Sequence, residues 1–356
     1  MTPRVPFGER GGALRGLLDL ATGCYPTFLF GGSLGRELPV FHFHDVTREW
    51  LEPRLQYLVD NGYRTVTCDE IARFAIDGTS PGPRAVALTF DDGWASAWSV
   101  ATPLLKQFRL SAILFAIPGR IQEDASPFIT WAQLGEMHAS GVWDIQSHTR
   151  SHAMVFTDFE VFTFVAPDYG KTPLLERPLT TVDGHPAFLR PEALGTPLYF
   201  QRSRMSDAPR YFSSEAAAER CRQHVARHGG PRFFDRPRWL AELHEIVAAE
   251  DDESERFETD EECAGSIRAE LAEGRALLND RLGTDAVRHV ALPWGIAGNI
   301  ARRALAETGH ETAFAERPLK RRGVHVGDDR YGLMRLNGKY LTCLPGRGRK
   351  WFFTTV

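Results

Sequence analysis

The sequence has few cysteines, no long apolar run and no strong excess of either charge. Its 356 residues include five scattered cysteines without a CxxC pair, which argues against a disulfide scaffold and favours a reducing compartment. No run of about 18 uncharged apolar residues occurs, so we expect no transmembrane helix. The 42 basic and 46 acidic residues give a net charge of −4, which excludes a global basic surface for nucleic acid.

The two ends of the chain differ from its body. The first residues, MTPRVPFGERGG, are polar and do not form a secretory signal, so we expect a cytoplasmic protein. We interpret residues 1–38 as an extension and residues 346–356 as a basic-aromatic tail. The apolar residues that share one helical face of the extension are Leu14, Leu17, Leu18 and Ala21. This face favours packing on the protein body, and a helix at the inner face of the membrane is the alternative.

Strand and helix patterns alternate along residues 39–152 and again along residues 260–345. The apolar run at 85–90 is typical of a strand buried on both faces. Helices are predicted at 50–58, 95–108, 131–138 (capped by Thr130), 260–282 and 299–308. This alternation predicts a parallel α/β fold.

Residues 153–259 interrupt the alternation. They contain nine prolines and five glycines, show few clear strands, and contain two plausible helices at 214–228 and 237–249. A loop of this length without function would be unusual. We therefore interpret the segment as an insertion that serves as a lid or an interaction element.

Two adjacent carboxylates, Asp91 and Asp92, follow the predicted buried strand within the motif TFDDG. In parallel α/β folds the carboxyl ends of the strands face the active site. A cation beside one carboxylate would neutralise it and leave the other free as a base. Taken alone, the motif is equally typical of a turn with helix-capping aspartates.

His148 and His152 frame the segment HTRSH, which also follows a predicted strand. Histidines four residues apart share one helical face and can bind one ion. One aspartate with two histidines leaves positions open for water and substrate, as catalytic metal sites require. Such a donor set suits Zn²⁺ best and accepts Co²⁺, Ni²⁺ or Fe²⁺.

Together with ALPWG at residues 291–295, these motifs resemble the polysaccharide deacetylase family, the NodB-homology group of carbohydrate esterase family four-like proteins. The connecting segments at 57–71, 129–149 and 304–314 are similar as well. The resemblance covers residues 39–152 and 260–345. It implies a distorted (β/α) barrel of seven strands, with the insertion between the HxxxH and PWG motifs.

The resemblance also implies a role for each motif residue. Asp92, His148 and His152 match the metal ligands of the family, and Asp91 matches the general base that acts on water. The backbone N–H of Trp294 matches the family position that donates to the oxyanion.

The general acid of the family is commonly a histidine in a late Leu-x-His motif. This chain lacks that histidine. The segment FHDV at 43–46 resembles an early segment that supplies this histidine in a subgroup of the family. We therefore assign the acid to His44, with a satisfied core histidine as the alternative. We expect His42 to point to the opposite face of the same strand.

Two further positions differ from the family. Many members carry an arginine that orients the base where this chain has Ala291. That role is either vacant or filled by Arg335. Gln146 replaces a usual glycine, and we expect it to narrow the pocket.

The expected reaction is metal-dependent hydrolysis of an N-acetyl group on an amino sugar, with release of acetate. The substrate would be a polysaccharide or a lipid- or nucleotide-linked glycan precursor, with peripheral membrane contact in the lipid-linked case. A deformylase or another C–N amidohydrolase of the same fold is one alternative. A catalytically inactive carbohydrate-binding relative is another.

Overall fold

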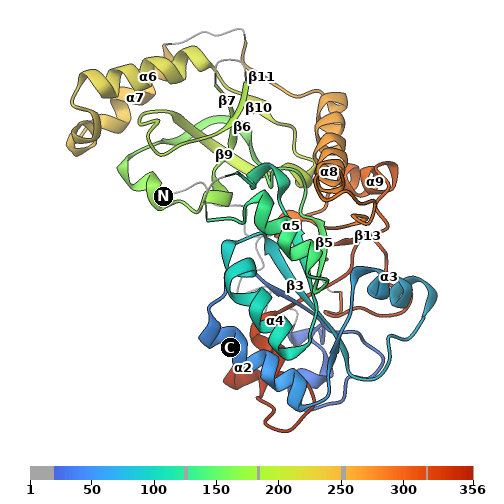
Figure 1. Cartoon of the computed structure of the whole chain (residues 1–356). Coiled ribbons are helices and arrows are strands. Elements are labelled where there is room, and N and C mark those ends of the chain that lie inside the picture. Colours follow the sequence, from blue (N-terminus) through green and yellow to red (C-terminus); the bar gives the residue numbers. More distant parts are fainter. Residues whose placement is uncertain (1–19, 124–126, 183–184, 250–253, 318–319, 356) are drawn as a thin grey trace. The chain divides into compact units, whose positions relative to one another are not determined.

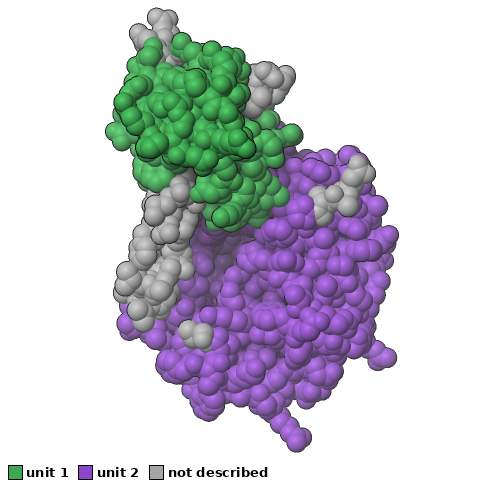
Figure 2. Space-filling model, turned by 90° about the vertical axis from the view of Figure 1, so that its left-hand side faces the viewer, with its two compact units in different colours: residues 1–11, 152–267 green, residues 12–151, 268–356 purple. Residues whose placement is uncertain are grey.

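The computed structural model describes residues 20–123, 127–182, 185–249, 254–317 and 320–355. Contacts between residues divide the chain into two compact units, shown in different colours in Figure 2. The middle unit consists of His152–Ile267, and the sheet unit joins the described residues before and after it. The sheet unit is therefore discontinuous in sequence.

A parallel sheet forms the centre of the sheet unit (Figure 1). Its strands are β1 (Val40–Phe43), β2 (Arg64–Thr65), β3 (Ala85–Asp92), β4 (Ala112–Ala116), β5 (Trp143–Ser147), β12 (His289–Ala291), β13 (Thr312–Phe314) and β14 (Leu336–Asn337). They follow the order β13-β12-β5-β4-β3-β1-β14, with β2 beside β3. An isolated bridge between Phe314 and Leu333 brings the two ends of this order together. The predicted distorted barrel of seven strands is confirmed, with β2 as a short addition.

Helices connect these strands. They are α2 (Arg48–Asp60), α3 (Cys68–Asp77), α4 (Thr102–Phe108), α5 (Trp131–Ala139), α8 (Asp260–Leu282) and α9 (Asn299–Glu307). The sequence predicts all of these except α3, and the predicted helix at 95–108 is divided. A π-helical stretch at Ala97–Ala101 precedes α4, which has Pro103 in its first turn. Proline has no N–H to contribute, so the start of a helix is where it is best tolerated.

Local sequence explains where these elements lie. β3 is buried along its whole length, as its apolar run predicts. The Thr130 hydroxyl accepts a hydrogen bond from the Gln133 backbone N–H, and the Gln133 side chain accepts one from the Thr130 N–H. This capping box fixes the predicted start of α5.

The described part of the middle unit contains antiparallel strand pairs and two helices. The elements are β6 (Met154–Phe164), β7 (Leu179–Val182), β8 (His185–Phe188), β9 (Pro197–Ser203), β10 (Tyr211–Phe212), β11 (Arg256–Phe257), α6 (Glu215–Arg227) and α7 (Trp239–Ala248). The two helices are confirmed, but the expectation of few strands is wrong. The pairing of β6 with β9 shifts register between Phe156 and Val161, and Phe159 stays 64% exposed. These irregularities break the period-two pattern by which strands are recognised.

Within the described residues, no helix combines the length and the apolar character needed to cross a bilayer. Most of the apolar helical face predicted for residues 14–21 lies outside the described residues. The roles assigned to the extension, the insertion and the tail stay predictions.

Candidate active site

The carboxyl ends of four neighbouring strands meet at one edge of the sheet. Asp92 on β3 pairs in register with Ala116 on β4, which pairs with Ser147 on β5, which pairs with Val290 on β12. His148 follows Ser147 directly. The parallel topology therefore brings the three sequence motifs together, as is usual for active sites of this fold class.

Asp92, His148 and His152 form a buried group whose candidate ligand atoms all lie within 4.8 Å of one another. His148 Nε2 lies 3.4 Å from Asp92 Oδ1. The other ring nitrogen, Nδ1, lies 2.7 Å from the carbonyl oxygen of Ala291, to which it can donate. This bond selects the tautomer whose Nε2 lone pair can bind a cation. The donor set fits a divalent transition metal.

The two histidines lie in a bent, non-helical segment that directly follows β5, as the sequence predicts, so the backbone of this segment and not a shared helical face brings them together. Thr149 and His152 have φ angles of 64° and 55°, in the left-handed region. Asp92 and Trp294, in the other two motifs, have φ angles of 72° and 53°. Non-glycine residues in this region are uncommon and cluster at functional sites.

Helix α8 and the β4–α5 connection hold this turn, and the sequence reasoning missed these contacts. Glu270 accepts hydrogen bonds from the Arg150 N–H through its backbone carbonyl, and from the Ser151 N–H and hydroxyl through its carboxylate. A Cβ atom at Gly274 would lie 2.7 Å from the Arg150 nitrogen, so only glycine permits this approach. The Gly119 N–H donates to the Arg150 carbonyl. Gly274, a glycine inside the predicted helix at 260–282, is the feature of the sequence that indicates a close approach at this point.

Asp92 has a further partner that the sequence did not reveal. The indole Nε1–H of Trp94 donates to Asp92 Oδ2 over 2.9 Å. His148 lies beside the other carboxylate oxygen. The two contacts fix the plane of the Asp92 carboxylate, and such outer contacts orient metal ligands.

Asp91 is 3% exposed and is paired with Arg335. Arg335 Nη1 and Nη2 donate to the two carboxylate oxygens over 2.6 and 2.7 Å, and Nη1 also donates to Thr89 Oγ1. Burial alone would raise the pKa of Asp91, but the charge and hydrogen bonds of Arg335, together with His148, hold it well below its usual range. Arg335 thus lies where an orienting arginine is needed, and its catalytic role stays a prediction.

His44 and His42 both lie close to Asp91. His44 Nε2 is 4.0 Å from Asp91 Oδ2, and the His44 side chain is 53% exposed. The prediction that His42 faces the other way is wrong, because residues two apart share one face of a strand. The two imidazole rings lie 5.5 Å apart. Burial, followed by the charge of Arg335, lowers the pKa of His42 to about 3, so His42 is neutral at ordinary pH.

Trp294 lies in the short turn Pro293–Gly295 that directly follows β12. The same strand ends at Ala291, whose carbonyl contacts His148. The predicted oxyanion donor therefore follows a strand that contacts the metal-binding histidine.

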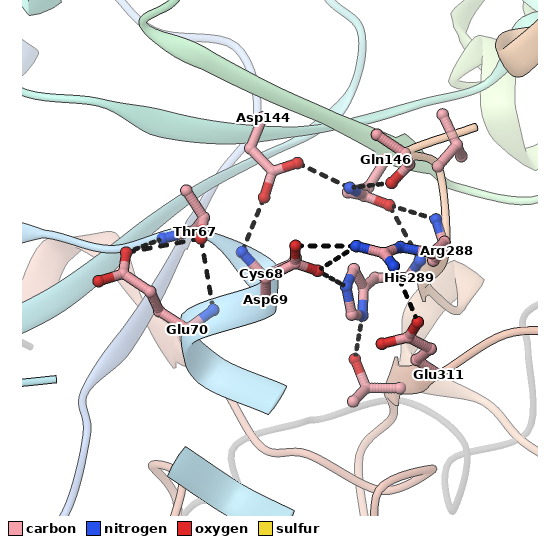
Figure 3. A network of polar contacts seen from close by, with 12 residues as sticks. Thr67, Cys68, Asp69, Glu70, Asp144, Gln146, Arg288, His289 and Glu311 are labelled. Carbon is pink, nitrogen blue, oxygen red and sulfur yellow. Dashed lines mark hydrogen bonds and ion pairs between the residues drawn. The ribbon is translucent and has the colours of Figure 1, made fainter. Parts of the chain in front are cut away.

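A second group of candidate ligands, Asp69, His289 and Glu311, gathers around the start of β12 (Figure 3). Arg288 is paired with both carboxylates, at 2.9 Å from Asp69 and 3.2 Å from Glu311. The His289 ring contacts Asp69 through Nε2 and the Thr312 hydroxyl through Nδ1. Because Arg288 already pairs with both carboxylates and His289 is hydrogen-bonded through both ring nitrogens, we interpret this group as a structural network.

Gln146 belongs to the same network (Figure 3). Its Oε1 accepts hydrogen bonds from the backbone N–H groups of Arg288 and His289, and its Nε2 donates to the Ala286 carbonyl. β5 and β12 share a single paired position, so the side chain replaces backbone partners where these strands separate. The expectation that Gln146 narrows the pocket is wrong, since its amide is directed into this separation.

Comparison with known proteins agrees with the motifs. The sequence pattern of the family described as polysaccharide deacetylase matches residues 78–165. The Bacillus subtilis protein YxkH, named for polysaccharide deacetylation, is 30% identical over 124 residues, which are 33% of this chain and 43% of YxkH. A Staphylococcus aureus poly-beta-1,6-N-acetyl-D-glucosamine N-deacetylase is 27% identical over 109 residues, which are 30% of this chain and 37% of that protein. The matches span less than half the length of these relatives.

The fold has a structural counterpart as well. The deacetylase domain of BpsB from Bordetella bronchiseptica superposes with a TM-score of 0.53. The match covers 86% of this chain and 97% of that domain, at 18% sequence identity. The similarity to known proteins therefore includes the fold as well as the sequence motifs.

Proposed function

We propose that this chain belongs to the polysaccharide deacetylase family, whose sequence pattern it matches in part, and that it is a metal-dependent hydrolase that removes the N-acetyl group from an amino sugar of a glycan. The observation that carries the proposal is the convergence of Asp92, His148 and His152 beside the Asp91–Arg335 pair. This arrangement combines a cation site with an ionised carboxylate, which the hydrolysis of an unreactive amide needs.

Asp92, His148 and His152 would hold the ion, for which zinc is the first choice. One carboxylate and two imidazoles are all buried and lie within reach of a common centre. When bound, the ion supplies Lewis acidity to the substrate carbonyl and to the attacking water.

Asp91 is the proposed base. Its carboxylate takes a proton from water while the hydroxyl oxygen bonds to the carbonyl carbon. Arg335 keeps the carboxylate ionised and fixes its plane through two hydrogen bonds. The Trp294 backbone N–H donates to the oxygen that becomes negative.

His44 is the proposed acid for the second half of the reaction. The bond between carbon and nitrogen breaks as His44 gives a proton to the leaving amine, and acetate and a free amino sugar result. His44 is half exposed and lies 4.0 Å from Asp91, so a substrate can reach the His44 ring close to the base. His42 is kept neutral by burial and is less suited to this role.

The test is product release by the purified protein with and without a chelator. The Staphylococcus aureus relative is named for poly-β-1,6-N-acetyl-D-glucosamine, so short oligomers of that polymer are the first substrate, followed by N-acetylated sugar nucleotides and polyprenyl-linked amino sugars. We expect chelator-sensitive acetate. Formate would identify a deformylase, and saccharide binding without any product would identify an inactive relative.

The proposed compartment is the cytoplasm. All five cysteines are buried, and none of them forms a disulfide, as is usual in a reducing compartment. Fractionation of cells with an antibody against this chain would test the assignment.

A further inference from the structure

Three exposed aromatic side chains lie together on the surface of the sheet unit. Phe30, Trp351 and Phe353 are 39%, 57% and 75% exposed. The ring centres of Phe30 and Phe353 lie 6.2 Å apart, and the Trp351 ring packs over Gly31, where a Cβ atom would lie 2.8 Å from it. Single exposed apolar residues are ordinary, whereas adjoining ones mark interaction surfaces. We call these three residues the aromatic patch.

Contacts within the sheet unit hold the aromatic patch in place. The Arg349 guanidinium donates to the backbone carbonyls of Phe28, Gly32 and Cys343. The buried Phe352 ring lies 5.1 Å from Phe30 and 5.4 Å from Phe353, and it stacks on Tyr340 at 5.2 Å. The patch is therefore formed before a partner arrives, and binding through it does not have to order the chain first.

Basic residues without acidic neighbours accompany the aromatic patch. Residues 338–355 contain four basic residues and no acidic one, although the whole chain has a net charge of −4. Lys350 directly precedes Trp351, and Lys339 Nζ lies 5.0 Å from the centre of the Tyr340 ring. Among the described residues, neither lysine pairs with a carboxylate. Both charges are therefore available to an anionic partner.

Tryptophan and phenylalanine beside unpaired lysines are typical of the interface between a bilayer and water. Tryptophan rings lie at the level of the lipid headgroups, and lysine and arginine side chains are attracted to anionic lipids. Protein–protein interfaces are instead depleted in lysine. The aromatic patch and its neighbouring lysines therefore fit an anionic lipid surface better than a protein partner.

We propose that the aromatic patch, together with Lys339 and Lys350, binds the surface of a membrane that contains anionic lipids. This gives the basic-aromatic tail a function. The patch contains none of the proposed catalytic residues, so the inference does not depend on the proposed hydrolysis. Membrane binding would concentrate the protein at a lipid surface without changing the chemistry of its active site.

The experiment is sedimentation of the full-length protein with vesicles of phosphatidylcholine that contain phosphatidylglycerol, and with vesicles of phosphatidylcholine alone. We expect the wild type to sediment with the anionic vesicles, and to do so less at high salt because salt screens the attraction. The double variant Trp351→Ser, Phe353→Ser should bind the anionic vesicles about ten-fold or more weakly, since two apolar rings are lost. The double variant Lys339→Gln, Lys350→Gln should lose about ten-fold in affinity and show a weaker dependence on salt.

Matched controls change the same residue types elsewhere. Phe159 and Phe162 are also exposed, and Phe159→Ser, Phe162→Ser should bind vesicles as the wild type does. Lys106 and Lys171 are exposed lysines outside the patch, and Lys106→Gln, Lys171→Gln should also bind normally. All four double variants should keep the wild-type melting temperature within a few degrees, which separates a lost contact from a lost fold.

Three outcomes would overturn the inference: a wild type that stays in the supernatant, equal binding to both kinds of vesicle, or losses in the controls as large as those in the patch variants. A wild-type dimer that Trp351→Ser, Phe353→Ser abolishes, without any vesicle binding, would assign the patch to a second copy of the chain. Vesicle binding by a protein that releases no acetate would reject the proposed function and leave this inference standing.

Discussion

Arg335 binds both carboxylate oxygens of Asp91 through two hydrogen bonds of 2.6 and 2.7 Å, although the two residues are 244 positions apart in the chain. The guanidinium is planar and presents both donors at once, which a lysine cannot do. The pair therefore fixes the orientation of the carboxylate as well as its charge.

We expect Arg335→Lys to lower kcat about 10- to 100-fold, because the charge remains while the orientation of Asp91 is lost. Steady-state kinetics and metal analysis would show reduced turnover at unchanged metal content. Arg302, which also pairs with an aspartate, Asp329, supplies the control Arg302→Lys, which should keep full activity. Full activity of Arg335→Lys would remove the orienting role.

The two adjacent aspartates should separate into different phenotypes. Asp92→Ala removes a metal ligand, so the affinity for the metal should fall by more than about ten-fold. Asp91→Asn should keep the metal and lose activity about 100-fold or more, since the base is gone. Metal analysis by mass spectrometry and acetate release would measure both effects. Equal loss of metal in the two variants would contradict this division of roles.

The two histidines near Asp91 should also differ. We expect His44→Gln to lower kcat about 100-fold, since it removes the proton donor. His42→Gln should lower kcat less than about five-fold, because a histidine with a pKa of about 3 carries no proton to donate at neutral pH. Comparing kcat with a substrate that carries a better leaving group would check the assignment, because His44→Gln should recover with that substrate. A larger effect at His42 would reverse the assignment.

Gln146 should matter for stability. Gln146→Ala would leave the backbone N–H groups of Arg288 and His289 without their side-chain acceptor, so we expect the free energy of unfolding to fall by about 1–3 kcal/mol. Urea denaturation would measure this loss. Gln223→Ala, which removes one exposed contact with Glu219, should change stability by less than about 0.5 kcal/mol. Equal effects of the two substitutions would mean that Gln146 does not join the strands.

Stability should fall at alkaline pH because of His325, which lies between Glu37 and Asp328. Hydrogen bonds to Asp328 and Glu37 raise its pKa to about 9, above the value of about 6.5 of a free histidine. Because the folded value is the higher one, the stabilisation is complete below about pH 6.5 and is lost as pH rises through 9. We expect a loss of about 1 kcal/mol, since solvent screens the site in part.

Urea denaturation between pH 6 and 9.5 would measure this change. His325→Gln should flatten the profile in this range, whereas His138→Gln, at an exposed helical position, should leave it unchanged. An identical slope in wild type and His325→Gln would exclude His325 as the cause.

Local patterns were enough to predict much of the fold. The apolar run that becomes β3, the Thr130 cap and the boundaries of α8 each follow from neighbours within a few residues. The motif residues Asp92 and His148 could be placed at one edge because parallel strands end there. Such features depend on periodicity and on the chemistry of helix ends.

Features that depend on distant contacts could not be predicted. Nothing near Glu270 indicates that it contacts a turn 119 residues earlier. The strand β6 was missed because its register with β9 is irregular. The orientation of His42 was a different kind of error, because the period of strands was applied incorrectly and the sequence itself was sufficient.

The hold of Glu270 and Gly274 on the turn that bears His148 has a consequence for biosynthesis. The ribosome synthesises the turn first. Glu270 and Gly274, which contact the turn, follow only after the whole middle unit has been synthesised. At about 5–20 residues per second, roughly ten seconds pass between synthesis of the turn and synthesis of Glu270. During this time His148 and His152 lack the contacts with α8 that hold the turn. The proposed metal would then be inserted only after translation of α8, because the site is incomplete before that point.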